Sequence, residues 1–104
     1  MKGRSLPIRY RDFYDIPRAV VVEYERTLYF LDCPFHPDLD DYDEYYTIYL
    51  IPDDLREAVD SMSWTDLGHR SQRIGTIRTS LIEFDDTKRQ AISARIFKGL
   101  QPHR

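Results

Sequence analysis

The feature that most constrains the fold of this chain is a period-two alternation of side chains over two neighbouring segments. Residues 18–25 and 27–33 are rich in β-branched and aromatic residues, and Val20 and Val22 fall on the side of an extended chain opposite Val21. Because side chains alternate between the two faces of a strand, the pattern predicts two strands. Few residues separate the segments, so we expect them to form an antiparallel hairpin.

The turn of this hairpin and the strand before it are less clearly marked. Glu25 and Arg26 lie where the turn should be, and neither is Gly or Asn, the residues that most readily supply the positive φ of tight hairpin turns. The sequence therefore leaves the pairing register of the two strands undetermined by a residue or two. Residues 8–11 alternate apolar and basic side chains, which predicts a short edge strand ahead of Pro17.

Two further strands are expected in the second half of the chain. Residues 45–51 are apolar or aromatic at nearly every position, so that Tyr46 falls on one side and Tyr49 on the other, each among aliphatic neighbours. Such a strand is expected to be covered on both faces. Residues 74–84 predict one longer or two shorter strands, and Gly75 is expected to mark a bulge.

Two capping boxes predict helices. Asp54 and Glu57 stand at the spacing at which each side chain can bond the other's backbone N–H, and apolar residues recur at helical spacing over residues 55–62. Residues 87–98 begin with a second capping box and are followed by Gly99, a typical helix terminator. We therefore expect an α+β fold, with a small, mainly antiparallel sheet of about five strands and two short helices on one face.

Length and composition limit the organisation of the chain. Its 104 residues are expected to form one domain, residues 1–104, because a second would leave each half too small for its own core. Apolar runs reach only about four residues, as in residues 19–22, against the roughly 20 that span a bilayer. The lone Cys33 excludes an intrachain disulfide, and no signal-peptide pattern follows the first residues, so a cytoplasmic location and no membrane partner are expected.

Charge is strongly segregated along the chain, although the formal net charge is only -3. Residues 32–66 contain eleven Asp and Glu and, of Arg and Lys, only Arg56. Both flanking segments carry an excess of Arg and Lys. Such asymmetry indicates electrostatic partners more than it indicates a fold.

The acidic middle segment also contains a cluster of tyrosines, and interface cores favour Tyr. An aromatic patch bordered by acids suits a basic protein partner, or the basic ends of a second copy of the chain. We therefore predict a non-enzymatic protein-interaction or self-associating module. The expected partner-binding residues are Asp38, Asp40, Asp41, Tyr42, Asp43, Glu44, Tyr45 and Tyr49.

A small nucleic-acid binder is the alternative prediction, because arginines interleaved with aromatic rings can combine phosphate contacts with base stacking. The negative net charge disfavours it. The residues that would carry it are Arg9, Tyr10, Arg11, Arg73, Arg78, Lys88 and Arg89.

A metal-dependent hydrolase or nuclease is the third alternative. His36, Asp38 and Asp40 are candidate metal ligands, but they complete neither an EF-hand loop nor a zinc site. Pro52-Asp53 and residues 86–88 match the letters of a nuclease pattern, although each falls at a predicted helix start where capping already explains it. No catalytic residue, resident metal or cofactor is therefore predicted.

Overall fold

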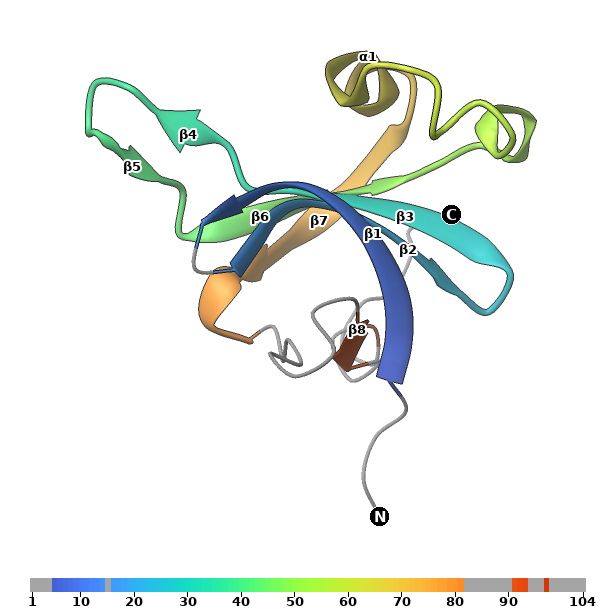
Figure 1. The fold of residues 1–104 in the computed structure, drawn as a ribbon, viewed down its shortest axis with the longest axis horizontal. Coiled ribbons are helices and arrows are strands. Elements are labelled where there is room, and N and C mark those ends of the chain that lie inside the picture. The colour runs from blue at the N-terminus through green and yellow to red at the C-terminus, as the bar shows by residue number, and fades with distance from the viewer. Residues whose placement is uncertain (1–4, 15, 82–90, 94–96, 98–104) are drawn as a thin grey trace.

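The fold is an antiparallel sheet whose strands mostly follow one another along the chain (Figure 1). A computed structural model describes residues 5–14, 16–81, 91–93 and 97. The strands are β1 (Ser5–Tyr14), β2 (Ile16–Tyr24), β3 (Thr27–Asp32), β4 (Phe35–His36), β5 (Asp41–Tyr42), β6 (Tyr45–Leu50), β7 (Gln72–Arg78) and β8 (Ala91–Ser93). The helical elements are η1 (Asp53–Leu55), α1 (Trp64–His69) and η2 (Thr79–Leu81).

The main sheet confirms the predicted antiparallel architecture. Its strands lie in the order β7-β6-β3-β2-β1, and the short β8 adds a sixth beside β1. Every pair of neighbours is antiparallel. Strands β4 and β5 form a separate two-stranded sheet that interrupts the chain between β3 and β6.

Strands β2 and β3 form the predicted hairpin and define its register. Val20 pairs with Leu31, and Val21 pairs with Phe30, so the two faces alternate as the sequence indicates. Only Glu25 and Arg26 connect the strands, and both have positive φ, 51° and 68°. This geometry matches the twist of a two-residue hairpin turn, even though neither residue is one that favours it.

Two expectations about the other strands need correction. The predicted short edge strand is the ten-residue β1, which curves across the sheet between β2 and β8 (Figure 1). Strand β7 begins before residue 74 and ends at Arg78, where η2 follows. The bulge predicted near Gly75 is present, because Ile48 pairs with Gly75 and Tyr49 pairs with Arg73.

The prediction of two helices is wrong. Asp54 lies in the three-residue η1, which has no side-chain cap, and the chain then continues through turns. Leu55 and Val59 of the predicted stripe are still buried, because turns packed on a sheet can bury apolar side chains as a helix would. In the described part of the chain, the one α-helix is α1, where the Ser63 hydroxyl accepts a hydrogen bond from the Asp66 N–H at 3.3 Å. Residues 91–93 form β8, and the other residues of the second predicted helix, apart from Phe97, lie outside the described parts.

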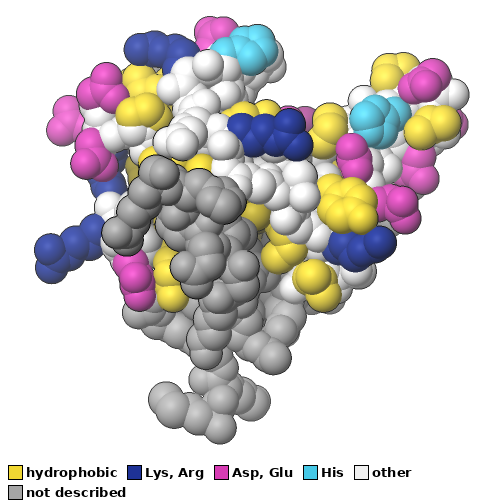
Figure 2. Space-filling view, turned by 180° about the vertical axis from the view of Figure 1, so that it is seen from behind, with side chains coloured by type: hydrophobic (Ala, Val, Ile, Leu, Met, Phe, Trp, Pro, Cys, Tyr) yellow, Lys and Arg dark blue, Asp and Glu magenta, His cyan; other side chains and the backbone are white. Residues whose placement is uncertain are grey.

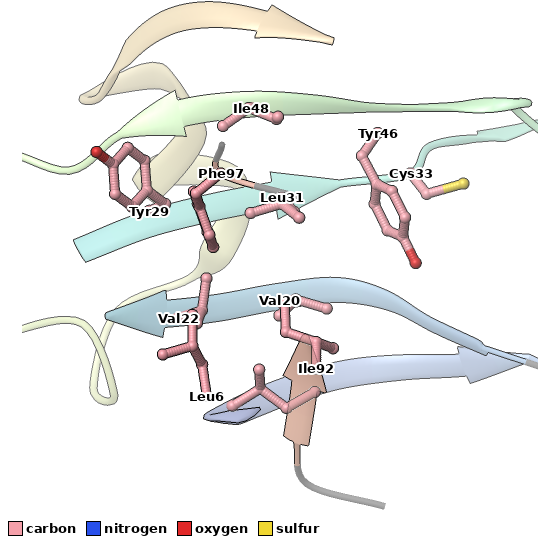
Figure 3. Packing of buried hydrophobic residues seen from close by; sticks show 11 residues of the cluster. Leu6, Val20, Val22, Tyr29, Leu31, Cys33, Tyr46, Ile48, Ile92 and Phe97 are labelled. Atoms are coloured by element: carbon pink, nitrogen blue, oxygen red, sulfur yellow. The ribbon is translucent and has the colours of Figure 1, made fainter. Parts of the chain in front are cut away.

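Buried side chains form one core cluster on each face of the sheet. The first cluster includes Val20, Leu31 and Ile48, and it is closed by Ile92 and Phe97 (Figure 3). The second cluster lies under η1 and α1 and comprises Ala19, Val21, Leu28, Phe30, Ile51, Leu55, Val59, Trp64 and Leu67. Strand β6 is thus covered on both faces, as expected. Within the described residues, no helix is long and apolar enough to cross a membrane.

Candidate functional site

Most of the predicted partner-binding residues lie on a projection from the sheet. Residues 34–44, which we call the arm, include the β4–β5 hairpin and extend beyond the end of the main sheet (Figure 1). Phe35 pairs with Tyr42 across the hairpin, and their rings meet edge to face at 5.1 Å. At the tip, Asp40 adopts a φ of 51°, a conformation that Asp tolerates better than most residues.

The base of the arm is fastened to the sheet by polar contacts around Cys33. The Cys33 thiol donates to the Asp43 carbonyl at 3.2 Å, and the Arg18 Nη1 donates to the Cys33 Sγ at 3.3 Å. The same guanidinium lies 4.4 Å from the centre of the Tyr42 ring. Burial raises the pKa of the Cys33 thiol. Cys33 therefore serves here as a buried neutral donor just after the end of β3.

A His–Asp contact closes the arm. His36 Nε2 lies 3.0 Å from Asp43 Oδ2, and Asp43 Oδ1 accepts a hydrogen bond from the Tyr45 N–H at 3.0 Å. The hydrogen bond with His36, followed by the one from Tyr45, lowers the pKa of Asp43 below its usual value. The carboxylate of Asp43 is thus used to hold the arm together.

The remaining acids of the arm face solvent beside exposed apolar side chains. Asp38, Asp40, Asp41 and Glu44 are exposed. Phe35 is 46% exposed and Leu39 is 70% exposed, and only Leu81 is a comparably exposed large apolar residue in the described part of the chain. Hydrophobic, acidic and histidine side chains gather on this projection at the upper right of Figure 2.

The two remaining tyrosines of the predicted site lie outside the arm. Tyr45 begins β6, where the Arg78 guanidinium lies 5.1 Å from its ring. Tyr49 lies near the other end of β6, and its ring stacks on Phe30 at 5.7 Å. The fold therefore brings the arm and Tyr45 together but places Tyr49 in a different environment.

The arginines proposed for nucleic-acid binding in β1 make contacts within the chain. Arg9 pairs with Asp60 at 2.7 Å. Arg11 donates to the carbonyls of Asp60 and Met62, and its guanidinium lies 4.4 Å from the Trp64 ring. These contacts join β1 to the segment between η1 and α1.

The other residues of the nucleic-acid prediction are dispersed. Tyr10 is partly buried against the first core cluster, on the face of β1 opposite the two arginines. Arg73 and Arg78 are exposed on β7, at the other end of the main sheet. Lys88 and Arg89 lie outside the described residues.

A cleft that the sequence did not indicate lies between α1 and the sheet. Its volume is about 360 Å³. The lining residues are Arg11, Asp12, Ala19, Phe30, Asp32, Tyr49, Trp64, Thr65, Gly68 and His69. They come from β1, β2, β3, β6 and α1, and their wide separation in sequence is the reason why no motif revealed them.

The Asp32 carboxyl group of the cleft is affected by its burial and by a neighbouring acid. Burial, and then the charge of Asp12, raise the pKa of Asp32 above its usual value. Asp12 itself has a φ of 58°, in the left-handed region. The cleft is a second candidate because it brings these two carboxyl groups, from β1 and β3, together beside aromatic rings.

No cluster of three or more His, Cys, Asp or Glu side chains able to hold a metal ion occurs in the described parts of the chain. His36 is paired with Asp43, while Asp38 and Asp40 lie at the solvent-exposed tip of the arm. Comparison of the chain with models of known families, with curated proteins and with solved structures finds no match.

Proposed function

We propose that this protein is a protein-interaction module that associates with a second copy of itself, with the acidic arm of one copy binding the arginine-bearing edge of the other. The arm carries the proposal. It combines two exposed apolar side chains, Phe35 and Leu39, with a border of acids, and its base is fastened by the contacts of Cys33 and Asp43. A fastened surface loses little conformational freedom on binding.

The chain itself supplies a complementary surface. Among the described strands, β7 lies at one edge of the main sheet and β8 at the other. Residues 67–81 contain Arg70, Arg73 and Arg78 and no acid. No ion pair joins these arginines to an acid within the described residues. A sheet edge has unpaired backbone groups that can accept a further strand, and here it is bordered by charge opposite to that of the arm.

An arm-to-edge contact joins two different surfaces, so it is a head-to-tail contact. The expected behaviour is reversible association that increases with protein concentration and weakens with salt, because exposed charges are screened. Sedimentation velocity from about 10 µM to about 1 mM protein would measure it. The comparison should be made in about 20 mM and about 500 mM salt.

Matched variants locate the contact. Asp38→Asn/Asp40→Asn should weaken association about five- to tenfold, because each exposed charge pair contributes up to about 1 kcal/mol. Asn also tolerates the positive φ at position 40. The control Asp53→Asn/Asp54→Asn changes net charge equally at the exposed η1 and should leave association unchanged.

Charge exchange gives the decisive test. Arg73→Glu should not associate with itself, but it should associate with an Asp38→Lys/Glu44→Lys variant, because the opposite charges are then restored in exchanged positions. A native protein that is monomeric at every concentration in low salt would overturn the proposal. Equal loss from the η1 control and the arm variant would overturn it as well.

A further inference from the structure

The cleft between α1 and the sheet has the construction of a small-molecule site that is separate from the arm. Its volume of about 360 Å³ lies within the usual range for ligand pockets. Phe30 and Tyr49 stack on each other, and Trp64 meets Phe30 edge to face at 5.7 Å. The ring of Trp64 is held in place because its indole N–H donates to the Val59 carbonyl at 3.1 Å. The aromatic part of the cleft is therefore held in place by contacts within the chain.

The cleft contains two carboxylates, of Asp12 and Asp32, against one guanidinium, that of Arg11, so its charge is net negative even though Arg11 keeps its own charge. The Arg11 guanidinium donates to the carbonyls of Met62 at 3.1 Å and Asp60 at 3.0 Å, and it covers the Trp64 ring. Arg11 therefore joins β1 to the segment before α1. His69, at the end of α1, is the other basic side chain that lines the cleft, and it is exposed.

The negative charges of the cleft have no such partners. Within the described residues, neither Asp12 nor Asp32 takes part in a side-chain hydrogen bond or ion pair. Asp32 is partly buried, and removing a carboxylate from water without a partner is costly. Both ionised carboxylates would be stabilised by a cation in the cleft, and the pKa of Asp32, which burial and Asp12 raise, would fall when one binds.

We propose that the cleft binds a small organic cation, an alkylammonium or alkylguanidinium ion, with its charged head beside Asp12 and Asp32 and its alkyl chain against Tyr49 and Phe30. Cationic heads form charge-assisted hydrogen bonds with carboxylates, and aromatic faces attract cations and alkyl groups alike. An anionic ligand would be repelled by both carboxylates.

Amide chemical shifts in a titration of the full chain would test this site. The probes are butylguanidinium and butylammonium chloride at constant ionic strength, with 1-butanol as the uncharged compound of equal chain length. The cations should shift the amide signals of Gly68 and His69 saturably, with half-saturation at about 1 mM or below. The alcohol should not do so, because it lacks the charge.

Four variants test whether cation binding depends on the two cleft carboxylates or on acids elsewhere in the molecule. Asp32→Asn and Asp12→Asn should each weaken cation binding about tenfold, because each removes a charged acceptor. Asn suits the positive φ at position 12, so the second variant retains the fold. Glu57→Gln, an exposed acid outside the cleft, and the arm variant Asp38→Asn/Asp40→Asn should bind like the native protein.

Three results would overturn the proposal: no saturable shift with either cation, equal shifts with 1-butanol, or native affinity in both Asp12→Asn and Asp32→Asn. The proposal does not rest on self-association. Its failure would be read from the cleft signals, whereas failure of the arm contact would be read from sedimentation.

Discussion

The turn of the β2–β3 hairpin is stable in a conformation that its residues do not favour. Glu25 and Arg26 have φ values of 51° and 68°, and the left-handed region costs a non-glycine residue about 1–2 kcal/mol. Asn-Gly is the preferred pair for a two-residue turn of this kind. The double variant Glu25→Asn/Arg26→Gly should therefore stabilise the protein.

The magnitude follows from the two residues separately. Glycine removes the steric cost at position 26 but adds conformational freedom to the unfolded chain, and Asn removes only part of the cost at position 25. We expect a net gain of about 1–2 kcal/mol, which for a domain of this size raises the melting temperature by about 4–8 °C per kcal/mol. The hydrogen bond from Arg56 Nη2 to the Arg26 carbonyl is retained, because its acceptor is backbone.

Guanidinium chloride unfolding, monitored by far-UV circular dichroism, measures the change in the free energy of unfolding. The control is Glu25→Ala/Arg26→Ala, which removes the same charges without supplying residues suited to positive φ. This control should be no more stable than the native protein. If the Asn-Gly variant is not stabilised, or if the Ala-Ala variant is stabilised equally, the strain argument is refuted.

Three further substitutions test the core and the cleft. Tyr46→Phe should lower the free energy of unfolding by about 1–3 kcal/mol in chemical denaturation, because the Tyr46 hydroxyl donates to the buried Pro17 carbonyl at 2.7 Å and no replacement donor can enter. Asp32→Asn should raise stability at neutral pH. The native protein has a raised pKa at Asp32, so ionisation of this group penalises the folded state above that pKa, and the advantage of Asn should disappear below the unfolded-state pKa of about 3.9. Unfolding measured as a function of pH checks this sign, and a constant advantage at all pH values would contradict it. Gly68→Ala should raise the melting temperature by an amount equivalent to about 0.5–1 kcal/mol, because Gly in a helix loses more conformational freedom on folding than Ala does. The added Cβ fits, since it would meet Phe30 at an ordinary contact distance of 3.5 Å. The same methyl group should weaken binding of butylguanidinium in the cleft.

The parts of the fold that could be predicted are those that depend on neighbouring residues. Alternation over β2, β3 and β6 indicated which side chains share a face, and the pairing of Val20 with Leu31 and of Val21 with Phe30 agrees with it. The helix predictions were wrong because a local pattern does not decide how apolar side chains are buried. Residues 55–62 have a helical pattern, but burial of Leu55 and Val59 is satisfied by turns packed on the sheet.

The candidate sites differ in the same way. The acids of the arm could be picked out from the sequence because they are close together in the chain, but the exposure of Phe35 and Leu39 was not predicted. The cleft could not, because Asp12, Asp32 and Gly68 approach one another only when β1, β3 and α1 pack together. Their residue types are unremarkable when read singly.

The sequence by itself therefore determined the antiparallel hairpin, the two-sided burial of β6 and the segregation of charge, because each follows from side chains within a few residues of one another. Only the tertiary structure decided that Arg9 and Arg11 join β1 to the segment before α1, and that Asp32 shares a cleft with Asp12. These pairings depend on contacts between strands and loops far apart in the chain. Local propensities and short spacings carry no information about such contacts. The contacts form only when both faces of the whole sheet are buried.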